Sequence, residues 1–259
     1  MFSYRDWRRR RILKRARIPG HIWREAFSRS PVLHHLCDEE IERLRQLATL
    51  FLHEKAFEGA AGLALTEIMR ATIASQACLP ILNLGLDWYT GWVSVIIYPA
   101  GFVPDREYVD GDGVVHRSRH ALSGESWLRG PIILSWSDVA STGADTGHNL
   151  IIHECAHKLD MLDGSANGIP PLHRDMRVEA WTETFSQAYA DFLDRIHGGE
   201  EMAIDAYGAE EPGEFFAVLS EVFFERPRVI EQTYPAVYHQ LSAFYRQDPA
   251  RRATPRSTT

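Results

Sequence analysis

The chain has few cysteines, and their spacing excludes two classes of site. Cys37, Cys78 and Cys155 lie far apart in 259 residues and form no CxxC pair. Such an odd, scattered set builds neither a disulfide framework nor a thiolate zinc site, and it fits a reducing compartment. No apolar run has the length or purity of a membrane span or a signal core. We therefore expect a cytoplasmic protein with no membrane partner.

The chain also lacks an overall positive charge. Its formal net charge is -7, whereas nucleic-acid binders usually carry a basic field across the domain, so no direct nucleic-acid binding is expected. One segment differs, because residues 8–11, followed by Lys14, Arg15 and Arg17, form a basic block. Such a block can be a nucleic-acid arm, an anionic-lipid contact or a solvated helix face, and we favour the solvated face.

The apolar content of 45% suffices for one large core in a chain of this length. We expect one domain over residues 1–247, with a helical N-terminal portion at about 20–90 packed on it. A disordered polar tail is expected at 248–259. Apolar spacing predicts a helix at 39–55 behind Asp38, and a second helix from Thr66 to about Cys78.

Strand-like segments follow these helices. The runs at 92–98 and 131–136 are rich in β-branched and aromatic residues, and a turn at 110–113 lies between shorter strand-like segments. Together they predict a small antiparallel sheet. Helical patterns resume from Thr146 to Gly164, at 178–196 and at 214–225, where Pro227 ends the last helix. This order indicates an α+β fold.

One predicted helix carries a metal-binding motif. Residues 153–157 read HECAH, which matches HExxH. At 3.6 residues per turn, His153 and His157 point from one face one turn apart, so both imidazoles can bind one zinc ion. Glu154 lies one step round this face, where its carboxylate can deprotonate an attacking water without binding the metal.

A catalytic zinc site takes three protein ligands and keeps one position open, so a third donor is needed. The predicted helix at 214–225 supplies Glu214 and Glu221, which are seven residues apart. They share a face, but roughly 10 Å separates them at a rise of about 1.5 Å per residue, so one ion cannot bind both. Spacing alone does not choose between them.

Four segments carry a resemblance to a known family. They read LTEIMRATIASQACLPIL, WVSVIIYP, HECAHKLDMLDGSANGIPPL and EFFAVLSEVFFERP. These segments closely resemble the Mlc titration factor A family of bacterial zinc metallopeptidases, and the similarity runs from about Trp23 to Tyr245. It implies a zincin-like fold in which N-terminal helices and a small sheet precede the HExxH helix and the C-terminal helices.

The resemblance also implies the roles of single residues. In that family, and in the related catalytic domain of anthrax lethal factor, the third ligand is the glutamate that opens the EFFA segment, which is Glu214 here. A tyrosine seven residues earlier stabilises the reacting oxygen, and Tyr207 holds that position. The resemblance thus implies a gluzincin-type peptidase with aminopeptidase-like activity and one zinc ion per chain, bound by His153, His157 and Glu214.

Zinc chemistry suggests how the neighbouring residues act on a peptide substrate. Glu154 is expected to serve as general base and then to protonate the leaving amine, while Tyr207 donates a hydrogen bond to the carbonyl oxygen. Asp160 either orients a ligand histidine or is an acid at the surface or in the last turn of the helix. Glu221 either supports a ligand histidine or is a solvated glutamate, and we favour the first. The run at 131–136 could pair with an extended substrate.

A second hypothesis also comes from the resemblance. The family takes its name from sequestering Mlc, a repressor of sugar-uptake genes. The chain is therefore also a candidate regulator that binds and titrates an Mlc-like repressor, with peptidase activity secondary. No motif in the sequence marks such a binding surface.

Overall fold

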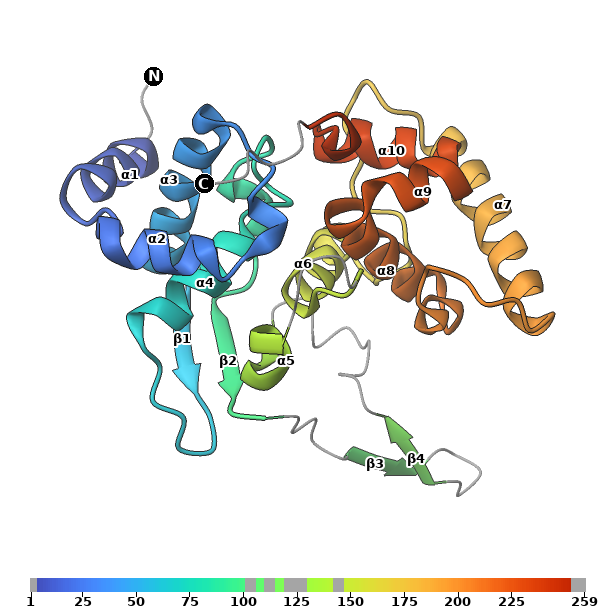
Figure 1. The fold of residues 1–259 in the computed structure, drawn as a ribbon, viewed down its shortest axis with the longest axis horizontal. Coiled ribbons are helices and arrows are strands. Elements are labelled where there is room, and N and C mark those ends of the chain that lie inside the picture. The colour runs from blue at the N-terminus through green and yellow to red at the C-terminus, as the bar shows by residue number, and fades with distance from the viewer. Residues whose placement is uncertain (1–3, 101–105, 110–114, 119–129, 142–146, 253–259) are drawn as a thin grey trace, which may run out of the picture.

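The computed structural model describes residues 4–100, 106–109, 115–118, 130–141 and 147–252. Helices dominate it, and they fall into two groups on either side of one central helix (Figure 1). The N-terminal group is α1 (Tyr4–Arg15), α2 (Gly20–Ser28), α3 (Asp38–Glu54) and α4 (Glu67–Ala77). The central helix is α6 (Leu150–Asp160), and the C-terminal group is α7 (Val178–His197), α8 (Pro212–Glu225), α9 (Pro227–Thr233) and α10 (Pro235–Tyr245).

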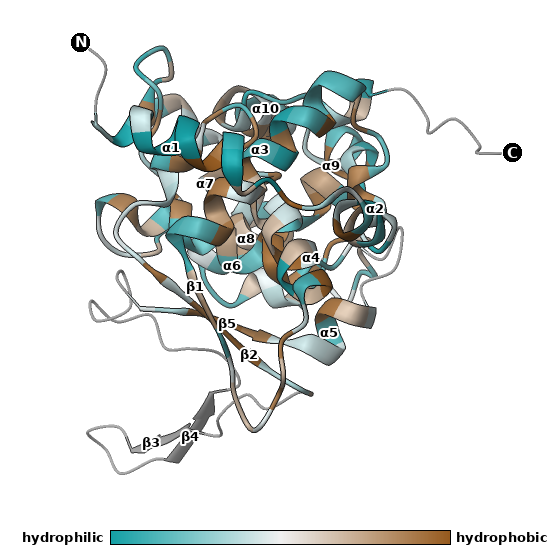
Figure 2. Ribbon diagram, turned by 90° about the vertical axis from the view of Figure 1, so that its left-hand side faces the viewer, coloured by the Kyte–Doolittle hydropathy of each residue, from teal (hydrophilic) through white to brown (hydrophobic). Residues whose placement is uncertain are grey.

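The main sheet is parallel, so the predicted antiparallel sheet is wrong. Its order is β1 (Ala56–Gly59), β2 (Ser94–Tyr98) and β5 (Ile132–Ser135), with β2 paired in parallel to both neighbours. Buried side chains alternate along the strands: Val95 and Ile97 of β2 lie in register with Ile132 and Leu134 of β5. One face therefore packs on the core, and the connection from β1 to β2 crosses over through α4, whereas the connection from β2 to β5 carries the two remaining strands. Figure 2 shows the helices above these brown strands.

The remaining strands are β3 (Arg106–Val109) and β4 (Val115–Ser118), which pair antiparallel as the sequence predicted. The turn predicted at 110–113 lies outside the described residues. β1 was missed because its sequence, AFEG, has no β-branched residue and is only four residues long.

The two N-terminal predicted helices are confirmed as α3 and α4, and the cap of α4 is the predicted one, because Thr66 Oγ1 accepts a hydrogen bond from Met69 N at 3.2 Å. Two helices were missed at the other end of the chain. Pro227 ends α8 but also begins α9, and Pro235 begins α10. Proline fits the first turn of a helix because its missing N–H has no intrahelical acceptor there.

Buried residues of both helical groups and of the sheet form one continuous hydrophobic cluster. Part of the predicted tail joins the folded body, because a 3-10 helix spans Pro249–Arg251 and Ala250 is buried. Arg252 donates to Glu40 Oε1 of α3 at 2.9 Å. Residues 253–259 of the predicted tail lie outside the described residues.

Candidate metal centre

The HExxH segment lies on α6, where the pattern of the sequence predicted a helix. Asn149 caps this helix, because its side-chain oxygen accepts a hydrogen bond from Ile152 N at 3.1 Å. Side chains on the face opposite the motif are fully buried, among them Ile152, Cys155 and Leu159. This packing directs the two imidazoles to the other face, where their ring centroids are 4.8 Å apart.

Glu214 reaches the same place from the first turn of α8, a helix that is buried along almost its whole length. Two close backbone contacts set the position of this turn. A Cβ atom on Gly213 would lie 2.9 Å from the carbonyl oxygen of Ala166, and a Cβ on Gly168 would lie 2.7 Å from that of Pro212. Only glycine allows the loop after α6 to approach α8 this closely.

Three donor atoms close a triangle between the two helices. His153 Nε2 lies 3.1 Å from both His157 Nε2 and Glu214 Oε2, and His157 Nε2 lies 3.3 Å from Glu214 Oε2. Ligands about 2.0–2.1 Å from a tetrahedral zinc ion are separated from one another by about 3.3 Å. The donor set therefore has the chemistry and the size of a zinc site. These three residues form the described group that could hold a metal ion.

The charges of the site favour a cation. Burial alone would raise the pKa of Glu214, but its hydrogen bonds to His153 and His157 outweigh burial and hold that pKa far below the usual range. Burial lowers the pKa of His153, yet the hydrogen bonds to Glu214 and Glu221 raise it to about 10. Without a metal, the His153 ring therefore carries an additional proton between the carboxylates of Glu214 and Glu221 at neutral pH. A metal ion that binds at His153 would displace this proton.

Glu221 supports the first histidine, as the sequence analysis expected. Its Oε1 lies 2.7 Å from His153 Nδ1, so Nδ1–H donates to it and Nε2 is left free to bind a metal ion. Its Oε2 accepts from the backbone N–H of Asn149. Glu221 is only 6% exposed, so both bonds are shielded from water.

Asn149 also belongs to the site, which was not expected from the sequence. Besides capping α6, its side-chain amide donates to Gln76 Oε1 of α4 at 2.9 Å and to Glu225 Oε1 of α8 at 2.8 Å. It thus ties three helices together beside the Glu221–His153 pair. An asparagine directly before an apolar helix is a recognisable cap, but no local signal indicates its partners, which lie more than 70 residues away in sequence.

Asp160 is completely buried, which excludes a surface position. Its Oδ2 accepts from Gly168 N at 2.8 Å, in the loop that contacts α8. Burial raises the pKa of Asp160 to about 7, against the lowering effects of that hydrogen bond and of His157. Among the described residues, neither Asp160 Oδ1 nor His157 Nδ1 has a hydrogen-bond partner, so Asp160 acts on the loop and does not bond to a ligand histidine.

Tyr207 and Glu154 complete the group of predicted residues. The ring of Tyr207 lies 6.0 Å from that of His153, and burial together with the charge of Glu214 raises the pKa of its hydroxyl above the ordinary value. Tyr207 therefore keeps its proton at neutral pH. The carboxylate of Asp205, also missed from the sequence, accepts from Tyr207 N at 2.9 Å and fixes the short helix Ala206–Ala209. Glu154 is half-buried, and its charge acts on both His153 and Tyr207.

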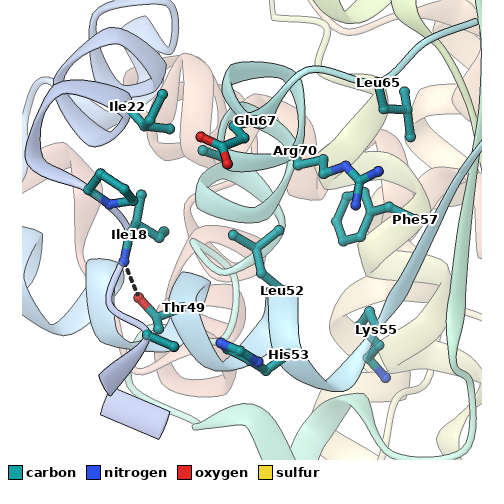
Figure 3. A pocket seen from close by; sticks show the side chains of 13 residues that line it. Ile18, Ile22, Thr49, Leu52, His53, Lys55, Phe57, Leu65, Glu67 and Arg70 are labelled. Atoms are coloured by element: carbon teal, nitrogen blue, oxygen red, sulfur yellow. Dashed lines mark hydrogen bonds between the residues drawn. The ribbon is translucent and has the colours of Figure 1, made fainter. Parts of the chain in front are cut away.

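A cavity of about 460 Å³ lies elsewhere, between α2, α3, α4 and β1 (Figure 3). Ile18, Leu52 and Phe57 are among its apolar lining residues, and Glu67 and Arg70 are among its charged ones. None of the predicted site residues lines it. The cavity is therefore separate from the group of predicted site residues between α6 and α8.

Comparison with known proteins decides the family. Residues 4–246 match the profile of the glucose-regulated metallo-peptidase M90 family. The chain belongs to this family. The α+β metallopeptidase fold is thereby confirmed, and the M90 assignment means that the chain is related to enzymes that require a metal ion.

Similarity to individual proteins also extends over most of the chain. The protein is similar to Mlc titration factor A from Salmonella arizonae, with 43% identity over 251 residues, 95% of this chain and 97% of the relative. It is also similar to Mlc titration factor A from Yersinia enterocolitica, with 42% identity over 234 residues, 89% of this chain and 86% of the relative. The resemblance stated from the sequence is confirmed. No helix of the described residues has the length and hydropathy of a membrane span.

Proposed function

We propose that the chain is a zinc-dependent peptidase that binds one zinc ion through His153, His157 and Glu214. The observation that carries this proposal is the convergence of the three donor atoms, all within 4.8 Å of one another. They come from two helices, and His157 and Glu214 are 57 residues apart along the chain. Membership of the M90 metallopeptidase family supports it. Nitrogen and carboxylate oxygen ligands in a set of three are typical of catalytic zinc.

The neighbouring residues supply the acid–base chemistry. When bound, zinc acidifies water and polarises the scissile carbonyl. Glu154 takes the proton of the attacking water and delivers it to the amine that leaves. Tyr207, protonated at neutral pH, donates a hydrogen bond to the carbonyl oxygen as that oxygen gains charge. Glu221 keeps the His153 ring in one tautomer and one orientation throughout.

The substrate of this proposal is an extended peptide. β5 has β2 on one side and forms an edge of the three-stranded sheet in the described structure. An extended chain can add to such an edge through backbone hydrogen bonds. Lys158 of α6 donates to the carbonyl oxygen of Gly130 at 3.0 Å, directly before β5, so the edge strand is attached to the helix that carries the metal ligands. The resemblance to the Mlc titration factor A family is what supports an aminopeptidase-like preference for short peptides, and we include it in the proposal.

The test of this function compares two glutamate variants. Hydrolysis of amino-acid amides and short peptides is measured for the zinc-loaded parent, Glu154→Gln and Glu179→Gln. Glu179 is an exposed glutamate on α7 and controls for the loss of one carboxylate. Loss of the general base should lower kcat about 10²–10⁴-fold at unchanged zinc content. Equal activity of all three proteins would remove Glu154 from the mechanism.

We also propose a regulatory function as the second candidate: the chain binds an Mlc-like repressor of sugar uptake in the cytoplasm. The name of the relatives, Mlc titration factor A, supports it, and the three unpaired cysteines fit a reducing compartment. A pull-down of purified repressor by Glu154→Gln separates the two functions. Retained binding supports titration, whereas binding that requires the intact base would assign the effect to proteolysis.

A further inference from the structure

Helix α1 has an unusual charge for this protein. Its twelve residues, YRDWRRRRILKR, contain seven Arg or Lys and one Asp, while the whole chain has a net charge of -7. α1 lies at the edge of the molecule beside α3, and its ribbon is strongly hydrophilic (Figures 1 and 2). α1 therefore carries seven of the 28 Lys and Arg residues of the chain within twelve positions, which makes it a local basic patch.

One face of α1 is fixed to the body of the protein. Arg9 donates to Glu54 Oε1 of α3 at 2.8 Å and to Asp87 Oδ1 at 2.7 Å, and Arg5 also pairs with Asp87. Ile12 and Leu13 pack against the hydrophobic core. These residues recur at helical spacing, so they hold α1 in one orientation and determine which side chains point outward.

The outward face combines cations with exposed aromatic rings. Tyr4 is 76% exposed and Trp7 is 53% exposed. Arg8, Arg11 and Lys14 are exposed beside them and form no ion pair with any described residue. α1 carries two of the four large hydrophobic side chains that the described surface exposes. Exposed aromatic rings that lie together are typical of an interaction surface and are not required for solubility.

The arrangement of the rings favours a lipid surface over nucleic acid. Tyr4 and Trp7 are stacked, with centroids 5.8 Å apart, and the Arg11 guanidinium lies 5.6 Å from the Trp7 ring. Ring faces that already stack on other groups are poorly placed to stack on bases, which is how aromatic residues bind single-stranded nucleic acid. A paired Trp and Tyr among Arg and Lys instead match the headgroup layer of a membrane, where aromatic edges insert and cations meet anionic lipids.

We propose that the outward face of α1, formed by Tyr4, Trp7, Arg8, Arg11 and Lys14, docks the protein on an anionic membrane surface. The contact is peripheral: none of the helices that the structure describes is long and apolar enough to cross a bilayer, and the metal centre between α6 and α8 is not part of the contact. The inference is independent of the catalytic proposal, because it rests on a helix that contributes no residue to the site.

The test is sedimentation of the full-length protein with vesicles of phosphatidylcholine, with or without one third phosphatidylserine. The parent should bind only the anionic vesicles, and added salt should release it. Replacement of Arg8, Arg11 and Lys14 by Gln should weaken binding about 100-fold, at about fivefold for each cation near the surface. The matched control replaces Arg24, Arg177 and Arg228, three exposed arginines outside α1, and should bind like the parent.

A second measurement tests insertion of the aromatic pair. Vesicles with brominated acyl chains should quench part of the tryptophan fluorescence of the parent, and Trp7→Phe should abolish this quenching. Equal binding of the parent to neutral vesicles, or equal losses in the two triple variants, would overturn the proposal. So would tighter binding to single-stranded DNA than to the anionic vesicles at the same salt concentration, because that result would assign the face to nucleic acid.

Discussion

Removal of the Glu221 side chain should weaken zinc binding although Glu221 is not a ligand. In Glu221→Ala, His153 Nδ1–H and the N–H of Asn149 both lose their acceptor inside the protein. Each buried donor left without a partner costs about 1–3 kcal/mol, so the free energy of unfolding should fall by about 2–6 kcal/mol. Because the His153 ring also loses its fixed orientation, zinc affinity should fall about 10–100-fold.

Competition with a chromogenic chelator measures this affinity, and Glu225→Ala is the matched control. Glu225 lies one turn further along α8 and also bonds to Asn149, through the side-chain amide at 2.8 Å, but no hydrogen bond joins it to either histidine. Its removal takes away the same charge, so zinc affinity should change less than about threefold by screened electrostatics alone. If both variants bound zinc as tightly as the parent, orientation of His153 by Glu221 would be refuted.

Three further predictions concern residues around the site. Tyr207→Phe should lower kcat about 10²–10³-fold with little change in KM, measured by steady-state hydrolysis, because it removes one donor to the developing oxyanion. In the metal-free protein Asp160 has a pKa of about 7 against an ordinary 3.8. The unfolded chain therefore loses this proton first, and stability falls as pH rises from about 4 to 7, by at most about 4 kcal/mol at about 1.4 kcal/mol per unit. Urea unfolding of Asp160→Asn should lack this fall. Gly213→Ala should cost about 1–3 kcal/mol, because its Cβ meets a backbone oxygen, whereas Gly20→Ala, with open space around Gly20, should leave the thermal midpoint unchanged.

The chemistry of the site could be predicted from the sequence because HExxH is local. The spacing of His153 and His157 alone determines that their rings share a helix face. Glu214 is different, since Glu221 lies on the same face and spacing left both open. In the structure the two glutamates have different partners. Glu214 contacts the Nε2 atoms of both histidines, whereas Glu221 contacts Nδ1 of His153.

Other features were beyond sequence reasoning because they depend on distant contacts. The parallel order of β1, β2 and β5 depends on the long connections between the strands, not on the strand sequences. Asn149 joins α4, α6 and α8 through partners that no local pattern identifies. The outward position of the stacked Tyr4–Trp7 pair likewise depends on distant contacts, because the bonds of Arg9 to Glu54 and Asp87 set the orientation of α1.

Anomalous diffraction at the zinc edge tests the central claim most directly. Crystals of the zinc-loaded protein should show one anomalous peak per chain, about 2.0–2.2 Å from Nε2 of His153, Nε2 of His157 and a carboxylate oxygen of Glu214. A peak bound by Glu221 instead of Glu214, or no peak between α6 and α8, would contradict the account.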